Sequence, residues 1–234
     1  MKKKLLSLLL ALCLVMALVP MTAFAAGTTD SWDGTADTSW YDENETEFHL
    51  QTAEQLAGMA KLINDDMANF KDKTIYLEND LDLGGHEWIS IGDGANTDVG
   101  SFQGVFDGQS HVVYNLYSHE GLKSENKDNN NNLYRNGLFG SIYNATVKNL
   151  GIENADIVIP MNDTSTYGKG ILVDWMTHST IKNCYTTGSI TGGSYIEKYI
   201  GGIAGFLNGN NSISQCYSTA AITGNYDGEY YAEQ

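Results

Sequence analysis

An internal repeat in the second half of the chain constrains its fold more than any other feature. The phrases VVYNLYS, TVKNLGI, TIKNCYT and SISQCYS each place an amide two residues after an aliphatic residue and directly before an apolar one. The amide column consists of Asn115, Asn149, Asn183 and Gln215. The apolar column consists of Leu116, Leu150, Cys184 and Cys216, with steps of 34, 34 and 32 residues. A fixed period of this length indicates a repeat architecture.

Stacking of the repeats predicts the fold class. A strand precedes each phrase, at 104–107, 137–140, 171–174 and 202–205, and it contains glycine in every copy but the third, where Ile171 and Asp174 stand at positions that are usually glycine. A unit of this size cannot bury its apolar face alone, whereas stacked copies extend each column through the core. The amides would then form a hydrogen-bonded ladder. We predict an all-β fold, a right-handed parallel β-helix (solenoid), with a β-sandwich as the alternative that needs no amide column.

The first 25 residues have the pattern of a secretory signal peptide. Lysines at 2–4 precede an apolar run from Leu5 to Val19, and a small-x-small pattern ends at Ala25. We predict cleavage after Ala25, with a membrane anchor as the alternative. The processed chain is expected to be secreted, with no attachment to a membrane.

Residues 26–98 form the predicted N-terminal leader and cap. The leader is expected to pack through its aromatic residues. Thr52 to Gln55 has the form of a capping box, and apolar residues follow at helical spacing, which predicts one helix over about 52–67. The apolar residues expected on one face of this helix are Leu56, Met59, Ala60, Ile63 and Met67. Short strands are predicted at 74–77 and 80–83.

The β-helix repeats are predicted over 99–234 and are expected to be incomplete at the C-terminus. No helix or terminal strand follows the last repeat to cover Ile213, Cys216 and Ile222. An uncovered coil presents unpaired strand edges and apolar columns. We therefore expect this open end to self-associate and the native chain to continue beyond it.

The charge of the chain disfavours polyanionic partners. Its 29 acidic and 13 basic residues give a formal net charge of −16. Such a surface repels nucleic acid and anionic membranes, so neither is an expected partner. The acidic side chains are expected mainly to form a solvated surface.

The motifs predict no enzyme. None of the five histidines lies in a metal-binding spacing such as HExxH. Asp80, Asp82, Asp107 and Asp174 could support acid–base chemistry, but Arg135 is the only arginine that could stabilise a carbanion. We predict no catalytic residue and no cofactor. The alternative is a β-helix polysaccharide lyase or hydrolase, and calcium is the ligand that the oxygen-rich loops 93–98 and 126–132 would favour.

Cys184 and Cys216 occupy one column of neighbouring repeats. Adjacent strands lie about 4.8 Å apart, which a disulfide tolerates, but in-register parallel side chains point the same way. We favour two free thiols in a buried ladder over a disulfide.

Several phrases resemble the GLUG repeat of bacterial cell-surface proteins. They are GLFG at 137–140 and GGIAG at 201–205, each leading to an aliphatic-x-amide phrase and later to GSITG or AAITG. The repeat also occurs in IgA-cleaving metallopeptidases. Segments from Trp32 onward are similar to the region that opens many such proteins. The resemblance implies a secreted, surface-displayed β-helix scaffold and supplies no catalytic residues.

These features together predict a non-enzymatic, adhesin-like scaffold on the bacterial cell surface that displays loops to a glycan or protein ligand. A non-catalytic part of a larger surface peptidase is a further alternative. Rigid aromatic rings lose little entropy on binding, so exposed tyrosines are the candidate contacts. They are Tyr185, Tyr195, Tyr199 and Tyr217.

Overall fold

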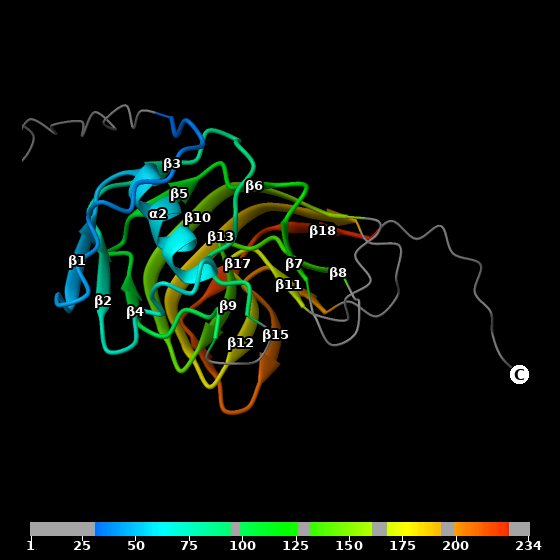
Figure 1. Cartoon of the computed structure of the whole chain (residues 1–234). Helices are drawn as coiled ribbons and strands as arrows, with labels where there is room; N and C mark the ends of the chain where they lie inside the picture. Colours follow the sequence, from blue (N-terminus) through cyan, green and yellow to red (C-terminus); the bar gives the residue numbers. More distant parts are fainter. Residues whose placement is uncertain (1–30, 95–98, 126–131, 161–167, 193–198, 225–234) are drawn as a thin grey trace, which may run out of the picture. The chain divides into compact units, whose positions relative to one another are not determined.

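The parallel β-helix predicted from the repeats is confirmed. A computed structural model describes residues 31–94, 99–125, 132–160, 168–192 and 199–224, and its parallel sheets stack as a β-solenoid of about four turns. The chain returns repeatedly to the same sheet, so strands far apart in the sequence lie side by side (Figure 1). The predicted signal peptide and Tyr195 lie outside the described residues.

One long sheet runs along the stack. Its path follows β1, β2, β4, β10, β13 and β16, and every neighbouring pair on it is parallel. Shorter strands also belong to this sheet: β3 pairs with β5, β5 and β6 pair with β10, and β17 and β18 pair with β13. The bounds are Glu47–Leu50 (β1), Thr74–Leu77 (β2), Leu81–Asp82 (β3), Val105–Asp107 (β4), Val112–Tyr114 (β5), Tyr117–Ser118 (β6), Thr146–Ile159 (β10), Thr180–Gly192 (β13), Ser212–Ser214 (β16), Tyr217–Ser218 (β17) and Ala221–Thr223 (β18).

Three smaller sheets complete the described structure. A parallel sheet has the order β9-β12-β15, β11 pairs with β14 in parallel, and β7 pairs with β8 antiparallel. The bounds are Leu122–Glu125 (β7), Asn132–Arg135 (β8), Phe139–Tyr143 (β9), Lys169–Gly170 (β11), Val173–Thr177 (β12), Ile200–Gly201 (β14) and Ala204–Asn208 (β15). The segments that begin at 137, 171 and 202 therefore lead into one sheet, as neighbouring strands.

A continuous apolar column explains why the strands of the long sheet stack. In-register partners across it are Phe48, Ile75, Phe106, Val147, Ile181 and Ile213. The first five are buried, whereas Ile213 on the last described coil is 40% exposed. Burial contributes about 25 cal/mol per Å² of apolar area, so each coil is stabilised by the next one.

The predicted helix is present but shorter than expected. Helix α2 spans Ala53–Asn64, and the Thr52 hydroxyl accepts a hydrogen bond from the backbone N–H of Gln55 at 3.4 Å. The predicted extension to residue 67 was wrong, because the helix ends at Asn64. Met67, which was expected on its apolar face, is 66% exposed. The reason is local, because Asp66 adopts a φ of 57° that ends the helical path.

The leader packs as predicted through its aromatic side chains. Trp32 is buried, and Trp40 and Tyr41 lie against the ring of Phe48 at centroid distances of 5.3 and 5.6 Å. The leader also crosses α2 at Gly58, where a Cβ atom would lie only 1.8 Å from the Asp37 carbonyl oxygen. Glycine at this position therefore allows the two backbones to approach.

The β-helix begins earlier than the boundary predicted at residue 99. Strands β1 and β2 belong to residues 26–98, yet β1 pairs with β2 and β2 pairs with β4 in the long sheet. Helix α2 connects β1 to β2, so it is inserted into the solenoid (Figure 1). The cap and the first coil are thus one structure, and sequence periodicity missed this because the early strands lack the repeated amide phrase.

The predicted repeat columns are correct for three of the four phrases. Leu150 pairs with Cys184, and the flanking pairs place Cys216 next in that column. Leu116 does not join it, because Val113 pairs with Ile152 rather than with Val147. The partner of Val147 is Phe106, so the 104–107 phrase lies in the long sheet.

A longer segment after the phrase caused this misalignment, because Ser118 and Phe139 are 21 residues apart whereas their partners Ile157 and Val173 are 16 apart. The preceding corner is enlarged as well. Residues 108–111 separate the paired Asp107 and Val112, whereas only residues 149–150 separate their partners Lys148 and Gly151. The extra residues turn through positive φ values of 50° at Gln109 and 72° at Ser110. The phrase VVYNLYS therefore belongs to a different corner from the other three.

The amide column marks corners of the coil. Asn149, Asn183 and Gln215 have φ values of 54°, 53° and 55°, in the left-handed region that asparagine tolerates better than most residues. One rung of the predicted ladder is present, because Asn183 Nδ2 donates to Asn149 Oδ1 at 2.9 Å. Asn149 Nδ2 in turn donates to Asp107 Oδ1 at 2.9 Å. The amides thus combine a backbone role with side-chain bonds between coils.

Candidate functional site

The structure brings together two of the four candidate tyrosines. Tyr185 and Tyr217 are in-register partners of β13 and β17, and their rings stack at 5.3 Å with an interplanar angle of 7°. Tyr199 lies elsewhere, with its ring 5.0 Å from that of Phe206. The predicted contacts therefore do not form one surface.

Contacts on the Tyr185 ring limit its use as a ligand platform. The ring lies over Gly151, where a Cβ atom would come within 2.6 Å of it, and Tyr217 covers the other side. The Tyr185 hydroxyl donates to Glu153 Oε1 at 2.7 Å. Burial raises the pKa of Tyr185, and this bond to a carboxylate raises it further. Tyr185 is thus a rung between coils, while Tyr217 stays 59% exposed.

A polar groove of about 380 Å³ lies over β3, β6 and β10. Two carboxylates, two amides and one phenol ring contribute to its wall. The lining residues are Ser31, Asp82, Gly84, Gly85, Asn115, Leu116, Tyr117, Asn154 and Asp156. Such convergence of polar groups in a concave site is typical of small-ligand binding.

Corner geometry positions the amides of this groove. Asn115 and Asn154 have φ values of 57° and 58°, and the Asn115 N–H donates to the Glu153 carbonyl at 2.9 Å. Neighbouring coils therefore place left-handed corners side by side. Asp82 Oδ1 accepts from Asn115 Nδ2 at 2.7 Å and from the Gly84 N–H at 2.8 Å, which holds its carboxylate at the wall.

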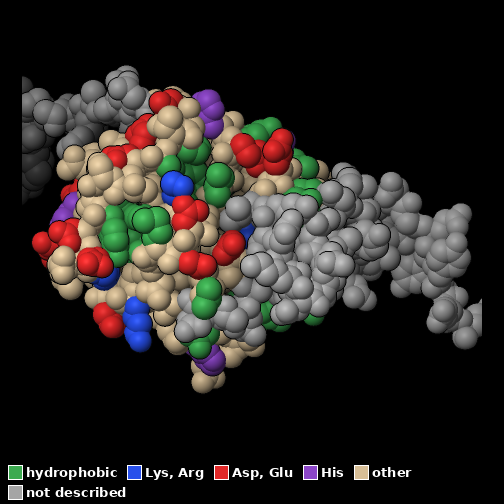
Figure 2. Space-filling model, in the orientation of Figure 1, with side chains coloured by type: hydrophobic (Ala, Val, Ile, Leu, Met, Phe, Trp, Pro, Cys, Tyr) green, Lys and Arg blue, Asp and Glu red, His purple; other side chains and the backbone are tan. Residues whose placement is uncertain are grey.

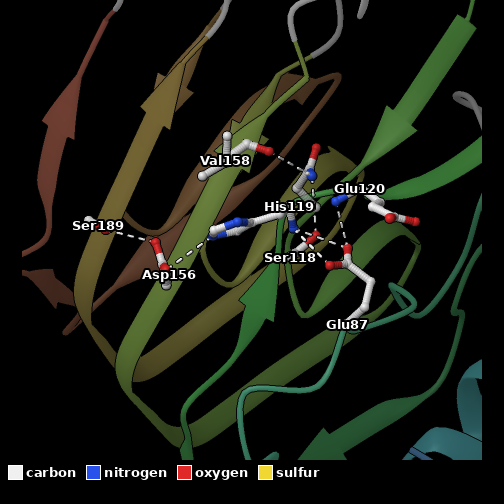
Figure 3. Close-up of polar contacts among 8 residues, drawn as sticks. Glu87, Ser118, His119, Glu120, Asp156, Val158 and Ser189 are labelled. Atoms are coloured by element: carbon white, nitrogen blue, oxygen red, sulfur yellow. Dashed lines mark hydrogen bonds and ion pairs between the residues drawn. The ribbon is translucent and has the colours of Figure 1, made fainter.

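Asp156, which lines the groove, is held by contacts with His119 and Ser189 (Figure 3). His119 Nε2 lies 3.0 Å from Asp156 Oδ2, and the imidazole stacks on the Tyr117 ring with centroids 3.9 Å apart. Ser189 Oγ donates to the second carboxylate oxygen of Asp156 at 3.4 Å. These contacts fix the orientation of a carboxylate that also faces the groove.

Glu87 holds the backbone that carries His119 (Figure 3). Its carboxylate accepts backbone N–H bonds from His119, Glu120 and Gly121 at 3.1, 2.8 and 2.9 Å. A carboxylate that accepts several N–H groups is a strong anchor, because charge-assisted bonds are about twice as strong as neutral ones. Glu87 is therefore a positioning residue for the groove.

The four carboxylates considered for catalysis all have hydrogen-bond partners. Asp80 Oδ1 accepts from the Val112 N–H at 2.9 Å and lies 3.0 Å from His111 Nδ1. Asp107 lies 3.1 Å from Lys148 Nζ. Burial raises the pKa of Asp107, but bonds from Asn149 and a backbone N–H, with Lys148, outweigh it and lower that pKa overall. Only Asp82 of the four lines the groove.

Asp174 lies in a fully buried polar cluster. Its carboxylate accepts backbone N–H bonds from Asn136, Gly137 and Gly170 at 2.7, 3.2 and 2.9 Å. Arg135 and Lys169 are also fully buried and interact electrostatically with it. Burial raises the pKa of Asp174, and the two cations and the amides oppose that rise. The glycine-to-aspartate departure in this repeat thus has a structural role.

Acidic side chains are spread over the face that Figure 2 draws, with few basic ones among them. Across the described residues no group of three or more His, Cys, Asp or Glu side chains is placed to hold a metal ion. Most of the two loops predicted to favour calcium lies outside those residues. Calcium binding therefore stays a prediction. In the same ranges, no helix is long and apolar enough to cross a membrane.

Both cysteines of the repeat column are free thiols in the structure, with Cys184 buried and Cys216 partly exposed. Burial raises the pKa of Cys184 to about 12. Because the thiolate is the reactive form, we expect iodoacetamide at pH 8 to label Cys216 first and Cys184 only after unfolding in urea. Peptide mass spectrometry over a time course would measure both rates. Absence of label at both sites in non-reducing urea would instead reveal a disulfide.

Comparison with known proteins returns no match. No family model, no curated protein and no solved structure is similar to the chain at a significant level. The resemblance to GLUG-repeat proteins therefore stays a prediction.

Sequence reasoning missed most of the groove. It singled out Asn115 and Leu116 as repeat positions and Asp82 as a carboxylate that could support acid–base chemistry, but not Tyr117, Asn154 or Asp156 as site residues. Asn154 carried a usable signal, because it follows Asn149 by five residues within one long strand and both occupy left-handed corners. Only the coil register shows that Asn154 lies beside Asn115.

Proposed function

We propose that this protein is a secreted, non-enzymatic, adhesin-like scaffold on a bacterial cell surface that binds a glycan in the groove over β3, β6 and β10. The observation that carries the ligand class is the convergence of Asp82, Asn115, Asn154 and Asp156 with Tyr117 in one groove. Secretion rests on the signal-peptide pattern, and surface display rests on the GLUG resemblance.

The chemistry of the groove suits sugar hydroxyl groups. A hydroxyl donates to carboxylate and amide oxygens and accepts from amide N–H groups, and the residues that line the groove include carboxylates and amides. Its carboxylates are held in place by bonds within the fold, so little ordering of side chains is needed on binding. Repulsion between this acidic protein and polyanions favours a neutral or cationic glycan over a sulfated one.

A glycan array probed with the full chain, followed by titration calorimetry, tests this proposal. We expect binding to a neutral or amino-sugar glycan, weakened about ten-fold or more by Asp156→Asn, because a bond to a charged group contributes about 1.5–3 kcal/mol. Asp65→Asn is the matched control, since Asp65 is an exposed carboxylate on the α2 side that pairs with Lys61. Uniform absence of binding, or equal affinity of Asp156→Asn and wild type, would contradict the proposal.

The carbohydrate-active enzyme is the competing function, favoured by the two carboxylates, Asp82 and Asp156, in one groove. Two carboxylates flanking a bond are the usual machinery of glycoside hydrolysis. Incubation with pectins, alginates and glycosaminoglycans separates the two functions. Product release that is lost in Asp156→Asn but kept in Asp65→Asn would replace the scaffold proposal with the enzyme.

A further inference from the structure

The last described coil, residues 199–224, is called the terminal coil below. It contains β14, β15, β16, β17 and β18 (Figure 1). β14 pairs with β11, β15 with β12, and the other three with β13. Among the described residues, each of these strands therefore has a neighbour on one side only. The free side offers backbone N–H and C=O groups in the pattern of a parallel ladder.

Apolar side chains are exposed along this coil at positions that are buried one coil earlier. Ile181 and Ile190 are buried, while their in-register partners Ile213 and Ile222 are 40% and 47% exposed. In the smaller sheet, buried Met176 pairs with Leu207, which is 45% exposed. Three apolar columns of the core thus end in side chains that are partly exposed to water.

The terminal coil lacks two features that often protect a sheet edge, charged side chains and proline. Residues 199–224 contain no charged residue and no proline, in a chain with a net charge of −16. Natural edge strands commonly carry charged side chains or proline, which disfavour pairing with another chain. The composition of this coil favours pairing instead.

Charge also indicates which partner fits. Two copies of an acidic protein repel one another through most of their surfaces, but at the charge-free coil that cost is lowest. We propose that the free side of the terminal coil binds the terminal coil of a second copy. The contact is isologous, with the same patch on both copies, and it buries Ile213, Ile222 and Leu207 of each.

Tyr217 is a further exposed side chain of the terminal coil. Its ring stacks on Tyr185 on one side and is 59% exposed overall. A second copy would cover it. Aromatic rings are enriched in the cores of protein interfaces, where they bury large areas at small entropic cost.

Sedimentation velocity of the full chain over a wide concentration range tests the proposal. We expect a reversible dimer that becomes tighter when salt screens the acid–acid repulsion. Ile222→Glu should raise the dissociation constant at least ten-fold, because it places two like charges in a desolvated contact. Tyr217→Glu is the second variant, since Tyr217 is the more exposed of the two and its replacement is the safer one for folding.

Ile89→Glu is the matched control, because Ile89 is 53% exposed and lies outside the terminal coil. It should dimerise as the wild type does, and circular dichroism at a concentration below dimerisation should show the same folded β spectrum for all variants. A monomer at every concentration would overturn the proposal. So would association that Ile222→Glu and Tyr217→Glu leave unchanged, since the contact would then involve another part of the chain.

Discussion

Replacing Asp174 by alanine is expected to lower the free energy of unfolding by about 3–5 kcal/mol, the cost of removing one charge from a buried cluster of opposite charges. The variant leaves three buried backbone N–H groups without their acceptor and two fully buried cations, Arg135 and Lys169, without the carboxylate. Urea denaturation followed by circular dichroism measures the loss. It is the largest effect that we expect from a single polar substitution.

Two further variants separate charge from hydrogen bonding at this position. Asp174→Asn keeps one acceptor oxygen and the side-chain shape but removes the charge, so we expect a smaller loss than with alanine. Asp65→Ala removes an exposed carboxylate that pairs with Lys61, and its expected cost is below about 1 kcal/mol. Equal stability of Asp174→Ala and Asp65→Ala would show that the buried cluster is not stabilising.

Replacing Ile181 by alanine is expected to destabilise the protein by about 2–5 kcal/mol, whereas Ile213→Ala should cost about 1 kcal/mol or less. The two residues are in-register partners of one column, but Ile181 is fully buried and Ile213 is 40% exposed. Alanine at Ile181 therefore leaves a cavity between two coils, while alanine at Ile213 leaves space that water fills.

Thermal and urea unfolding at a concentration below dimerisation compare these two variants without a contribution from association. Ile190→Ala and Ile222→Ala provide an independent pair in the neighbouring column, with the same difference in burial. If both members of each pair cost the same, the terminal coil is as well packed as the coil before it, and the stacking order described above is wrong.

The sequence predicted the stack itself because its signal is repeated. Leu150, Cys184 and Cys216 share a column in the structure as they do in the repeated phrases. Each copy of the phrase carries the same small constraint, a left-handed corner that asparagine tolerates next to an apolar residue that must be buried. Repetition makes a weak local pattern strong, and that is why the fold class could be predicted without a relative.

The first coil shows where this reasoning fails. Asn115 and Leu116 matched the repeated pattern but occupy another corner, because the segment from Ser118 to Phe139 is five residues longer than the one from Ile157 to Val173. Nothing in the local sequence distinguishes one left-handed corner from the next. Likewise, β1 and β2 carry no repeated phrase, and only their pairing with β4 places them in the solenoid.

The sequence by itself determined the parallel β-helix, its period, the helix that begins after Thr52 and the absence of charge from residues 199–224. Each of these depends on local patterns or on composition. Only the tertiary structure decided which corners are neighbours, and so brought Asn115, Asn154 and Asp156 into one groove and Asp174 into one buried cluster with Arg135 and Lys169. The physical reason is that coil lengths add along the chain, so one longer segment shifts which residues meet, while leaving every local preference satisfied.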